Sequence, residues 1–271
     1  MKTPSRPRWS PAPALRLSLA LHAAGLAGFA LHPAAWPWVA GALIGNHALL
    51  GAAGMVPRTR LLGPNLTRLP GAARARGEVA LTFDDGPDPQ GTSEILAILA
   101  RHGAKASFFC VGRRALAHPE TVRAIVGGGH SVENHSHTHA TAFACKGPWG
   151  LAREVATAQG AIRAAAGTTP RFFRPPFGFR SPFLDPVLAR QGLLQATWTR
   201  RGFDTAFGDP AALLRRLTRN LAAGDILLLH DAGSARTPSG EPVARAVLPP
   251  LLARIEASGL RAVSLPMALA P

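Results

Sequence analysis

The amino-acid sequence predicts an α/β protein: a distorted (β/α) barrel of about seven strands that follows a pair of transmembrane helices. Two patterns favour this fold class. Residues 17–57 contain no Asp, Glu, Lys or Arg, which is enough chain for two membrane spans of about 20 residues each. From Glu78 onward, short apolar runs alternate with longer helical patterns, as expected for parallel strands joined by helices.

The two transmembrane helices are predicted at about residues 15–31 and 36–55. Pro33 and Pro37 interrupt the helical pattern between them and favour a turn. A cleaved signal peptide ending near Ala35 is the alternative, but it leaves the second apolar segment unexplained. We therefore expect a helical hairpin that anchors the chain.

Three parts are expected along the chain: the membrane anchor at residues 1–60, a linker rich in Gly, Pro and Arg at 61–77, and the barrel domain at 78–271. Apolar runs predict strands at 79–83, 106–111, 131–134, 172–173, 193–198, 226–229 and 260–264. Helical patterns that often stop at glycine predict helices from 92 or 93 to 103, and at 113–126, 151–166, 184–190, 210–222 and 243–257.

The chain is strongly basic, with 30 Lys and Arg against 15 Asp and Glu and a formal net charge of +15 at pH 7. This balance fits an anionic membrane surface, nucleic acid, or an arginine-rich solvated surface. No aromatic–basic interleaving and no nucleic-acid module is found, so no nucleic-acid partner is predicted. Two cysteines, Cys110 and Cys145, do not make a disulfide framework.

Ionisable side chains follow five of the predicted strands. In α/β barrels the active site forms from loops at the carboxyl ends of the strands. One such residue alone is weak evidence, because Asp-Asp-Gly-Pro is usually only a turn. Several at one rim predict a site, and they are Asp84, Asp85, His135, His137, His139, Arg174, Asp204, His230 and Asp231.

A metal site is predicted from the His-Ser-His-Thr-His segment at 135–139. His135 and His139 are four residues apart, so on a helical turn both imidazoles share a face. A carboxylate completes a two-His-one-carboxylate site, and either Asp84 or Asp85 can supply it. The other carboxylate is then free to act as a general base.

Three further residues complete a hydrolytic arrangement. Arg174 can hold the base ionised and oriented. His230 can protonate a leaving amine, with Asp204 raising its pKa. Together with the metal site, this is the arrangement for metal-assisted hydrolysis of an amide.

From about Glu78 to its end, the chain resembles the polysaccharide deacetylase family, the domain shared by chitin, peptidoglycan and nodulation-factor deacetylases. Four segments carry the resemblance: Thr-Phe-Asp-Asp-Gly-Pro at 82–87, His-Ser-His-Thr-His at 135–139, Arg-Pro-Pro-Phe-Gly at 174–178 and Leu-Leu-His at 228–230. The resemblance implies Asp84 as base, Arg174 as the residue that steadies it, and His230 as acid tuned by Asp204. It also implies Asp85, His135 and His139 as metal ligands, and Phe177, Pro176 and Leu228 as substrate-binding residues.

The fourth motif departs from the family pattern, which reads Asp-x-x-Asp-Trp. Here Arg201 replaces the first Asp and Thr205 replaces the Trp, whereas Asp204 remains. The loss of the Trp removes one wall of the usual groove. This change bears on the substrate and leaves the chemistry intact.

The resemblance implies removal of an N-acetyl group from an amino sugar in a polysaccharide or oligosaccharide. It implies one divalent ion as cofactor, zinc most simply, with cobalt, manganese or nickel as alternatives. Deacylation of a lipid-linked sugar precursor is an alternative function, since the predicted anchor adjoins the barrel and the basic linker suits lipid phosphates. A catalytically inactive carbohydrate-binding relative is a further alternative.

The predicted location is the inner cell membrane, in contact with membrane lipid. Lys2, Arg6, Arg8 and Arg16 precede the first predicted span, and Arg58, Arg60 and Arg68 follow the second. The loop between the spans has no Lys or Arg. Because positively charged flanks tend to remain in the cytoplasm, the barrel is expected on the cytoplasmic side.

Overall fold

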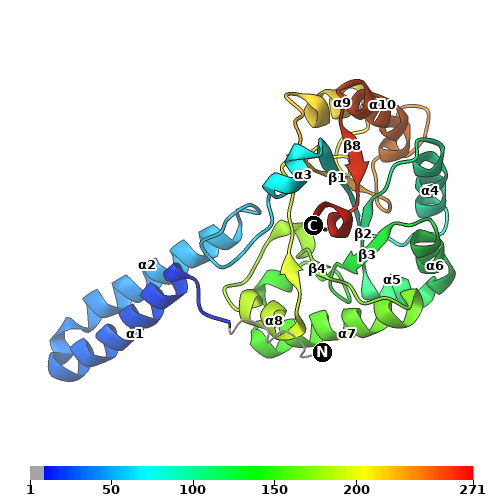
Figure 1. Ribbon diagram of the computed structural model, residues 1–271. Coiled ribbons are helices and arrows are strands. Elements are labelled where there is room, and N and C mark those ends of the chain that lie inside the picture. Colours follow the sequence, from blue (N-terminus) through cyan, green and yellow to red (C-terminus); the bar gives the residue numbers. More distant parts are fainter. Residues whose placement is uncertain (1–8, 271) are drawn as a thin grey trace.

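The computed structural model describes residues 9–270. A curved parallel sheet with helices around it forms the main body, and a long helical hairpin stands out from one side (Figure 1). The α/β barrel expected from the sequence is therefore confirmed. Its sheet is curled and open, because β5 and β6 at the two ends of the strand order do not pair.

The sheet has eight strands, all paired in parallel, in the order β5-β4-β3-β2-β1-β7-β6, with β8 also paired to β1. β8 lies beside the first half of β1, and β2 lies beside the second half. The seven expected strands are present, and the sequence missed the two-residue β6. The bounds are β1 Glu78–Asp84, β2 Ser107–Cys110, β3 Ser131–Asn134, β4 Phe172–Phe173, β5 Leu194–Gln195, β6 Arg200–Arg201, β7 Ile226–His230 and β8 Arg261–Val263.

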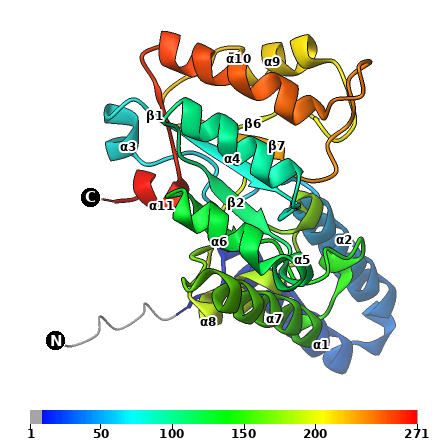
Figure 2. The same ribbon diagram turned by 90° about the vertical axis from the view of Figure 1, so that its right-hand side faces the viewer.

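Helices cover the outside of the curved sheet (Figure 2). The helix expected over residues 113–126 is two helices, because His118 takes a non-helical conformation (φ −132°, ψ 59°) before Pro119, and proline disfavours the helical region for the residue before it. The helices of this body are α3 Gly71–Ala75, α4 Gly91–Arg101, α5 Gly112–Ala117, α6 Pro119–Gly127, α7 Pro148–Ala166, α8 Leu184–Gln191, α9 Pro210–Thr218, α10 Val243–Ala257 and α11 Leu265–Ala268, with short 3-10 turns η2 Phe143–Cys145 and η3 Pro176–Gly178.

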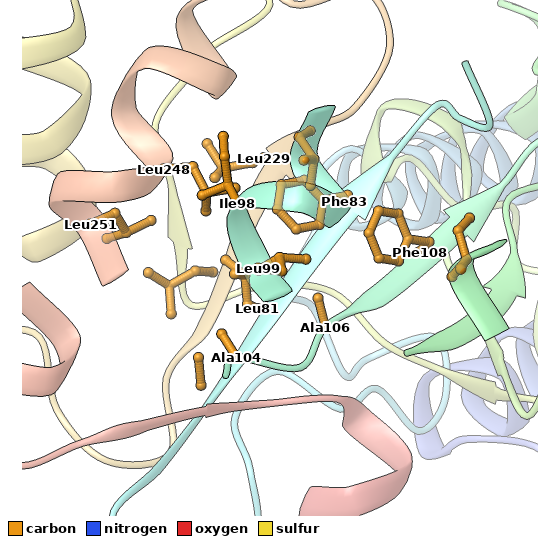
Figure 3. Close-up of a cluster of buried hydrophobic side chains, with 14 of the residues drawn as sticks. Leu81, Phe83, Ile98, Leu99, Ala104, Ala106, Phe108, Leu229, Leu248 and Leu251 are labelled. Carbon is orange, nitrogen blue, oxygen red and sulfur yellow. The ribbon is translucent and has the colours of Figure 1, made fainter. Parts of the chain in front are cut away.

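The largest part of the core lies between the sheet and the outer helices (Figure 3). Phe83 of β1 stacks on Phe108 of β2 with ring centroids 5.1 Å apart. Each fully buried side chain of this kind stabilises the fold by about 1.5–3 kcal/mol. The core fixes the strands, and so fixes where their carboxyl ends lie. Its central members are Leu81, Phe83, Ile98, Leu99, Phe108, Leu229, Leu248 and Leu251.

The hairpin consists of α1 Pro13–Leu31 and α2 Trp36–Gly54, joined by the 3-10 turn η1 Pro33–Ala35. It leaves many large apolar side chains exposed, which is unusual for a surface that faces water. Within residues 9–270, α1 is the one helix long and apolar enough to cross a membrane. The exposed apolar residues include Leu17, Leu19, Leu26, Phe29, Leu31, Trp36, Trp38, Ile44 and Leu49.

The end of α2 is fixed directly to the main body. The Arg180 N–H donates to the Gly54 carbonyl at 3.0 Å, and the buried Arg180 guanidinium donates to the carbonyls of Leu62 and Gly63. A Cβ on Gly54 would lie only 2.3 Å from the Arg180 carbonyl oxygen. Residues 61–77, expected as a linker, also contact the body. The Leu66 N–H donates to the Gln195 carbonyl of β5, and the Thr197 N–H donates to the Leu66 carbonyl.

We predict that Gly54→Ala weakens this attachment. The added methyl group must displace the Arg180 backbone, so the free energy of unfolding should fall by about 1–3 kcal/mol. Gly51→Ala is the matched control, because a Cβ on Gly51 meets nothing within 4 Å. Unfolding of the detergent-solubilised protein measures both variants, and equal stabilities would contradict the prediction.

Candidate active site

The candidate site lies at the carboxyl ends of the strands. The register of β1 and β7 places Asp84 beside His230, although the two residues are far apart in the sequence. A cavity of about 210 Å³ opens there. Its lining residues are Asp84, Asp85, His135, His139, Phe177, Gly178, Trp198, Arg201, Thr205, Leu228, His230 and Gly233.

Asp85, His135 and His139 form a cluster whose ligand atoms all lie within 4.8 Å of one another. The Asp85 Oδ1 atom is 3.3 Å from His135 Nε2 and 3.1 Å from His139 Nε2. This oxygen is buried and has no hydrogen-bond partner among residues 9–270. A buried carboxylate oxygen without a partner is unfavourable, and a cation would satisfy it. Two imidazoles and one carboxylate are a ligand set that suits zinc and similar divalent ions.

The orientation of the His135 ring is set by a hydrogen bond at its Nδ1 atom. Its Nδ1 lies 2.8 Å from the Arg174 carbonyl oxygen, which can only accept, so Nδ1 carries the proton. Nε2 therefore presents its lone pair to the cluster, as in many metal sites.

The loop that carries His139 is held by polar contacts and by unusual backbone conformations. The His139 N–H donates to Ser136 Oγ at 3.1 Å. Glu154 of α7 accepts from the N–H groups of His137 and Thr138 and from the Thr138 hydroxyl. The sequence did not single out Glu154, because an isolated carboxylate on a helix gives no signal of what it caps. His137 packs against Gly112 and stays outside the cluster.

Asp84 is held by a buried ion pair. The Arg174 Nη1 atom donates to Asp84 Oδ1 at 2.6 Å, and both side chains are nearly inaccessible to solvent. The remaining guanidinium donors bind Thr82 Oγ1 and the carbonyls of Ala196 and Thr197. With four of its five N–H donors used, Arg174 holds Asp84 in one orientation. The other oxygen, Oδ2, lies 3.8 Å from His135 Nε2, beside the metal-ligand cluster.

His230 is held by Asp204. The His230 Nδ1 atom lies 2.9 Å from Asp204 Oδ1, and the His230 backbone N–H donates to Oδ2 at 2.8 Å. Since the carboxylate accepts at Nδ1, Nε2 is left for the cavity. Burial disfavours the charged imidazole, but the hydrogen bond and charge of Asp204 raise the pKa of His230 above its ordinary value.

Two of the three residues expected to bind substrate line the cavity, and the third does not. Phe177 and Leu228 line the cavity. Pro176 is buried and is not among the lining residues. Arg201 also lines the cavity, although the sequence pointed to it only through the altered fourth motif. Trp198 lines the cavity as well.

Residues 72–196 match the family described as "Polysaccharide deacetylase". A chitooligosaccharide deacetylase of Sinorhizobium fredii is 35% identical over 167 residues, covering 61% of this chain and 77% of that protein. A peptidoglycan-N-acetylglucosamine deacetylase of Bacillus cereus is 29% identical over 175 residues, covering 64% and 81%. The structure of a family 4 carbohydrate esterase from Streptomyces lividans, in complex with acetate, has a TM-score of 0.62 and 33% identity, covering 69% and 91%.

We predict that His139→Ala removes bound divalent metal, because two ligands hold such an ion far more weakly than three. Elemental analysis of the purified protein should show metal in the wild type and little in this variant. His137→Ala is the matched control from the same loop, and it should retain its metal. Full occupancy in His139→Ala would remove His139 from the ligand set.

Proposed function

The chain belongs to the polysaccharide deacetylase family, and we propose that Asp84, Asp85, His135, His139, Arg174, Asp204 and His230 carry out its reaction. The protein is a hydrolase of the amide bond that deacetylates N-acetylated amino sugars, as its relatives do. One observation carries the assignment of residues. A candidate base and a candidate acid line the same cavity as a three-ligand cluster, and each is held by its own buried partner.

A divalent ion held by Asp85, His135 and His139 would polarise the amide carbonyl and make water more acidic. Asp84 accepts the proton of the attacking water at Oδ2, because Oδ1 is occupied by Arg174. The fixed guanidinium keeps the Asp84 carboxylate aimed at the cavity. Zinc is the proposed ion, since it favours this ligand set.

His230 donates a proton to the departing amine from Nε2, while Asp204 stabilises the positive charge on the imidazole. Leu228 provides an apolar surface for the methyl group of the acetyl. The Phe177 N–H is a candidate donor to the oxyanion. Phe177 has a positive φ of 59°, and no hydrogen bond from its N–H is found within residues 9–270.

A lipid-linked amino sugar is the second candidate substrate, and the position of the hairpin favours it. The end of α2 contacts Arg180, which follows η3, and a Cβ on Gly178 would lie 2.9 Å from Pro57. The hairpin therefore joins the body at the edge that bears the cavity. Aromatic and aliphatic side chains exposed near this edge suit a membrane boundary, namely Met55, Val56, Leu61, Phe177, Phe179 and Phe183.

We further propose that both hairpin helices lie in the membrane. α2 contains the polar residues Asn46 and His47, and both face α1. The Asn46 side chain donates to Ser18 Oγ at 2.8 Å, and His47 lies edge-on to His22 with ring centroids 5.1 Å apart. Such contacts between helices satisfy polar groups inside a bilayer. Each helix has 19 residues, a length of about 28 Å, close to the apolar thickness of a bilayer.

We predict that Asp84→Asn keeps the metal and loses activity by about a hundredfold or more, the usual effect of a general base. The amide oxygen of Asn can still accept from Arg174, so the site should remain assembled. Acetate release from chitooligosaccharides, peptidoglycan fragments and lipid-linked N-acetyl sugars measures the activity, and elemental analysis measures the metal. An active Asp84→Asn enzyme would assign the base to another residue. No acetate from any substrate with metal-loaded wild type would contradict the proposed function.

We propose that the barrel lies on the cytoplasmic side, because both ends of the hairpin carry Lys or Arg. We predict that a fluorescent protein fused after Pro271 is fluorescent and that alkaline phosphatase fused there is inactive. High phosphatase activity without fluorescence would place the barrel outside the cytoplasm and favour a polymeric substrate.

A further inference from the structure

Arg201 places an unneutralised positive charge in the wall of the active-site cavity. Its guanidinium Nε is buried without a hydrogen-bond partner, and none of the ion pairs or side-chain hydrogen bonds found within residues 9–270 includes it. Of the nearby carboxylates, Asp84 pairs with Arg174, and Asp85 belongs to the metal-ligand cluster. A buried charged donor without a partner is unfavourable, so Arg201 is suited to a partner from outside the chain.

The position of Arg201 is fixed by its strand and by two aromatic rings. In the pairing of β6 with β7, Arg201 is the partner of Leu228, the residue proposed to contact the acetyl group. The guanidinium carbon lies 5.4 Å from the ring centroid of Trp198 and 5.1 Å from that of Phe203. Such stacking orients a guanidinium and leaves its edge free for hydrogen bonds.

The preceding residue, Arg200, differs from Arg201 because a carboxylate neutralises its positive charge. Arg200 forms an ion pair with Asp225 and donates to the carbonyls of Arg219 and Asn220. Arg200 therefore has a structural role on the other side of β6. Arg201 has no such partners among the described residues, although it belongs to the same two-residue strand.

We propose that Arg201 determines specificity by binding a phosphate group on the N-acylated sugar itself. The proposal rests on the proposed deacetylase function and specifies its substrate. A guanidinium binds phosphate oxygens with two parallel hydrogen bonds. Because Arg201 and the candidate catalytic residues share one cavity of about 210 Å³, the phosphate belongs to the sugar unit that is deacetylated. A lipid phosphate or a nucleotide can carry it, and the hairpin at the same edge favours the lipid.

Binding to the metal-free protein provides the first test, since it removes any contact between phosphate and a bound ion. N-acetylglucosamine 1-phosphate should bind the wild type more tightly than N-acetylglucosamine. Arg201→Gln should lose about 10- to 100-fold of the affinity for the phosphate compound, the usual effect of losing a hydrogen bond to a charged group, and Arg201→Lys should lose less. Arg58→Gln is the control, because it removes an exposed arginine at the same edge that does not line the cavity.

Kinetics of the metal-loaded protein separate the sources of the phosphate. Three substrates are compared: a neutral chitooligosaccharide, a nucleotide-linked N-acetylhexosamine and a polyprenyl-phosphate-linked one in vesicles. Arg201→Gln should raise KM for the phosphorylated substrates that the wild type accepts and leave the neutral one unchanged. Equal binding of the phosphate and neutral sugars by wild type, or an equal loss on all substrates, would overturn the proposal. Either result would still be compatible with the deacetylase function. That function would be contradicted if the wild type hydrolysed none of the three substrates.

Discussion

The buried ion pair between Asp84 and Arg174 is the interaction on which the rest of the site depends. The Arg174 side chain positions the candidate base, and its carbonyl oxygen positions the candidate ligand His135. The guanidinium also binds the backbone after β5, so it connects the β5 end of the sheet with β1. Removing one partner would leave a buried charge, at a cost of about 3–5 kcal/mol. The same contacts therefore serve stability and the arrangement of the site.

Backbone strain is concentrated around this ion pair. Asp85, Ser136, His139, Phe177 and Phe203 all have positive φ values although they carry side chains. Each such conformation costs about 1–3 kcal/mol and persists only where its surroundings enforce it. Here the enforcing contacts are hydrogen bonds such as those from the loop of residues 136–139 to Glu154. The strain turns the loops so that their side chains converge on one cavity.

The sequence predicted which residues line the cavity better than it predicted the bounds of the helices and strands. Parallel strands have their carboxyl ends at one edge, so residues such as Asp84 and His230 could be brought together without coordinates. The separation of α5 from α6 and the short β6 were missed, because each depends on one or two residues within a longer pattern. Glu154 and the exclusion of Pro176 from the cavity depend on tertiary contacts that no local pattern records.

On the membrane location proposed above, the direct attachment of α2 to the loop after η3 fixes the distance between the cavity and the bilayer. Gly54 bonds to Arg180, and Pro57 lies against Gly178, next to Phe177 in the cavity wall. No flexible arm separates the hairpin from the cavity. With the hairpin in a bilayer, the cavity stays at a constant height above the headgroups. The rate of encounter then depends on the number of substrate molecules per unit area of membrane, and a polymer beyond that height lies out of reach.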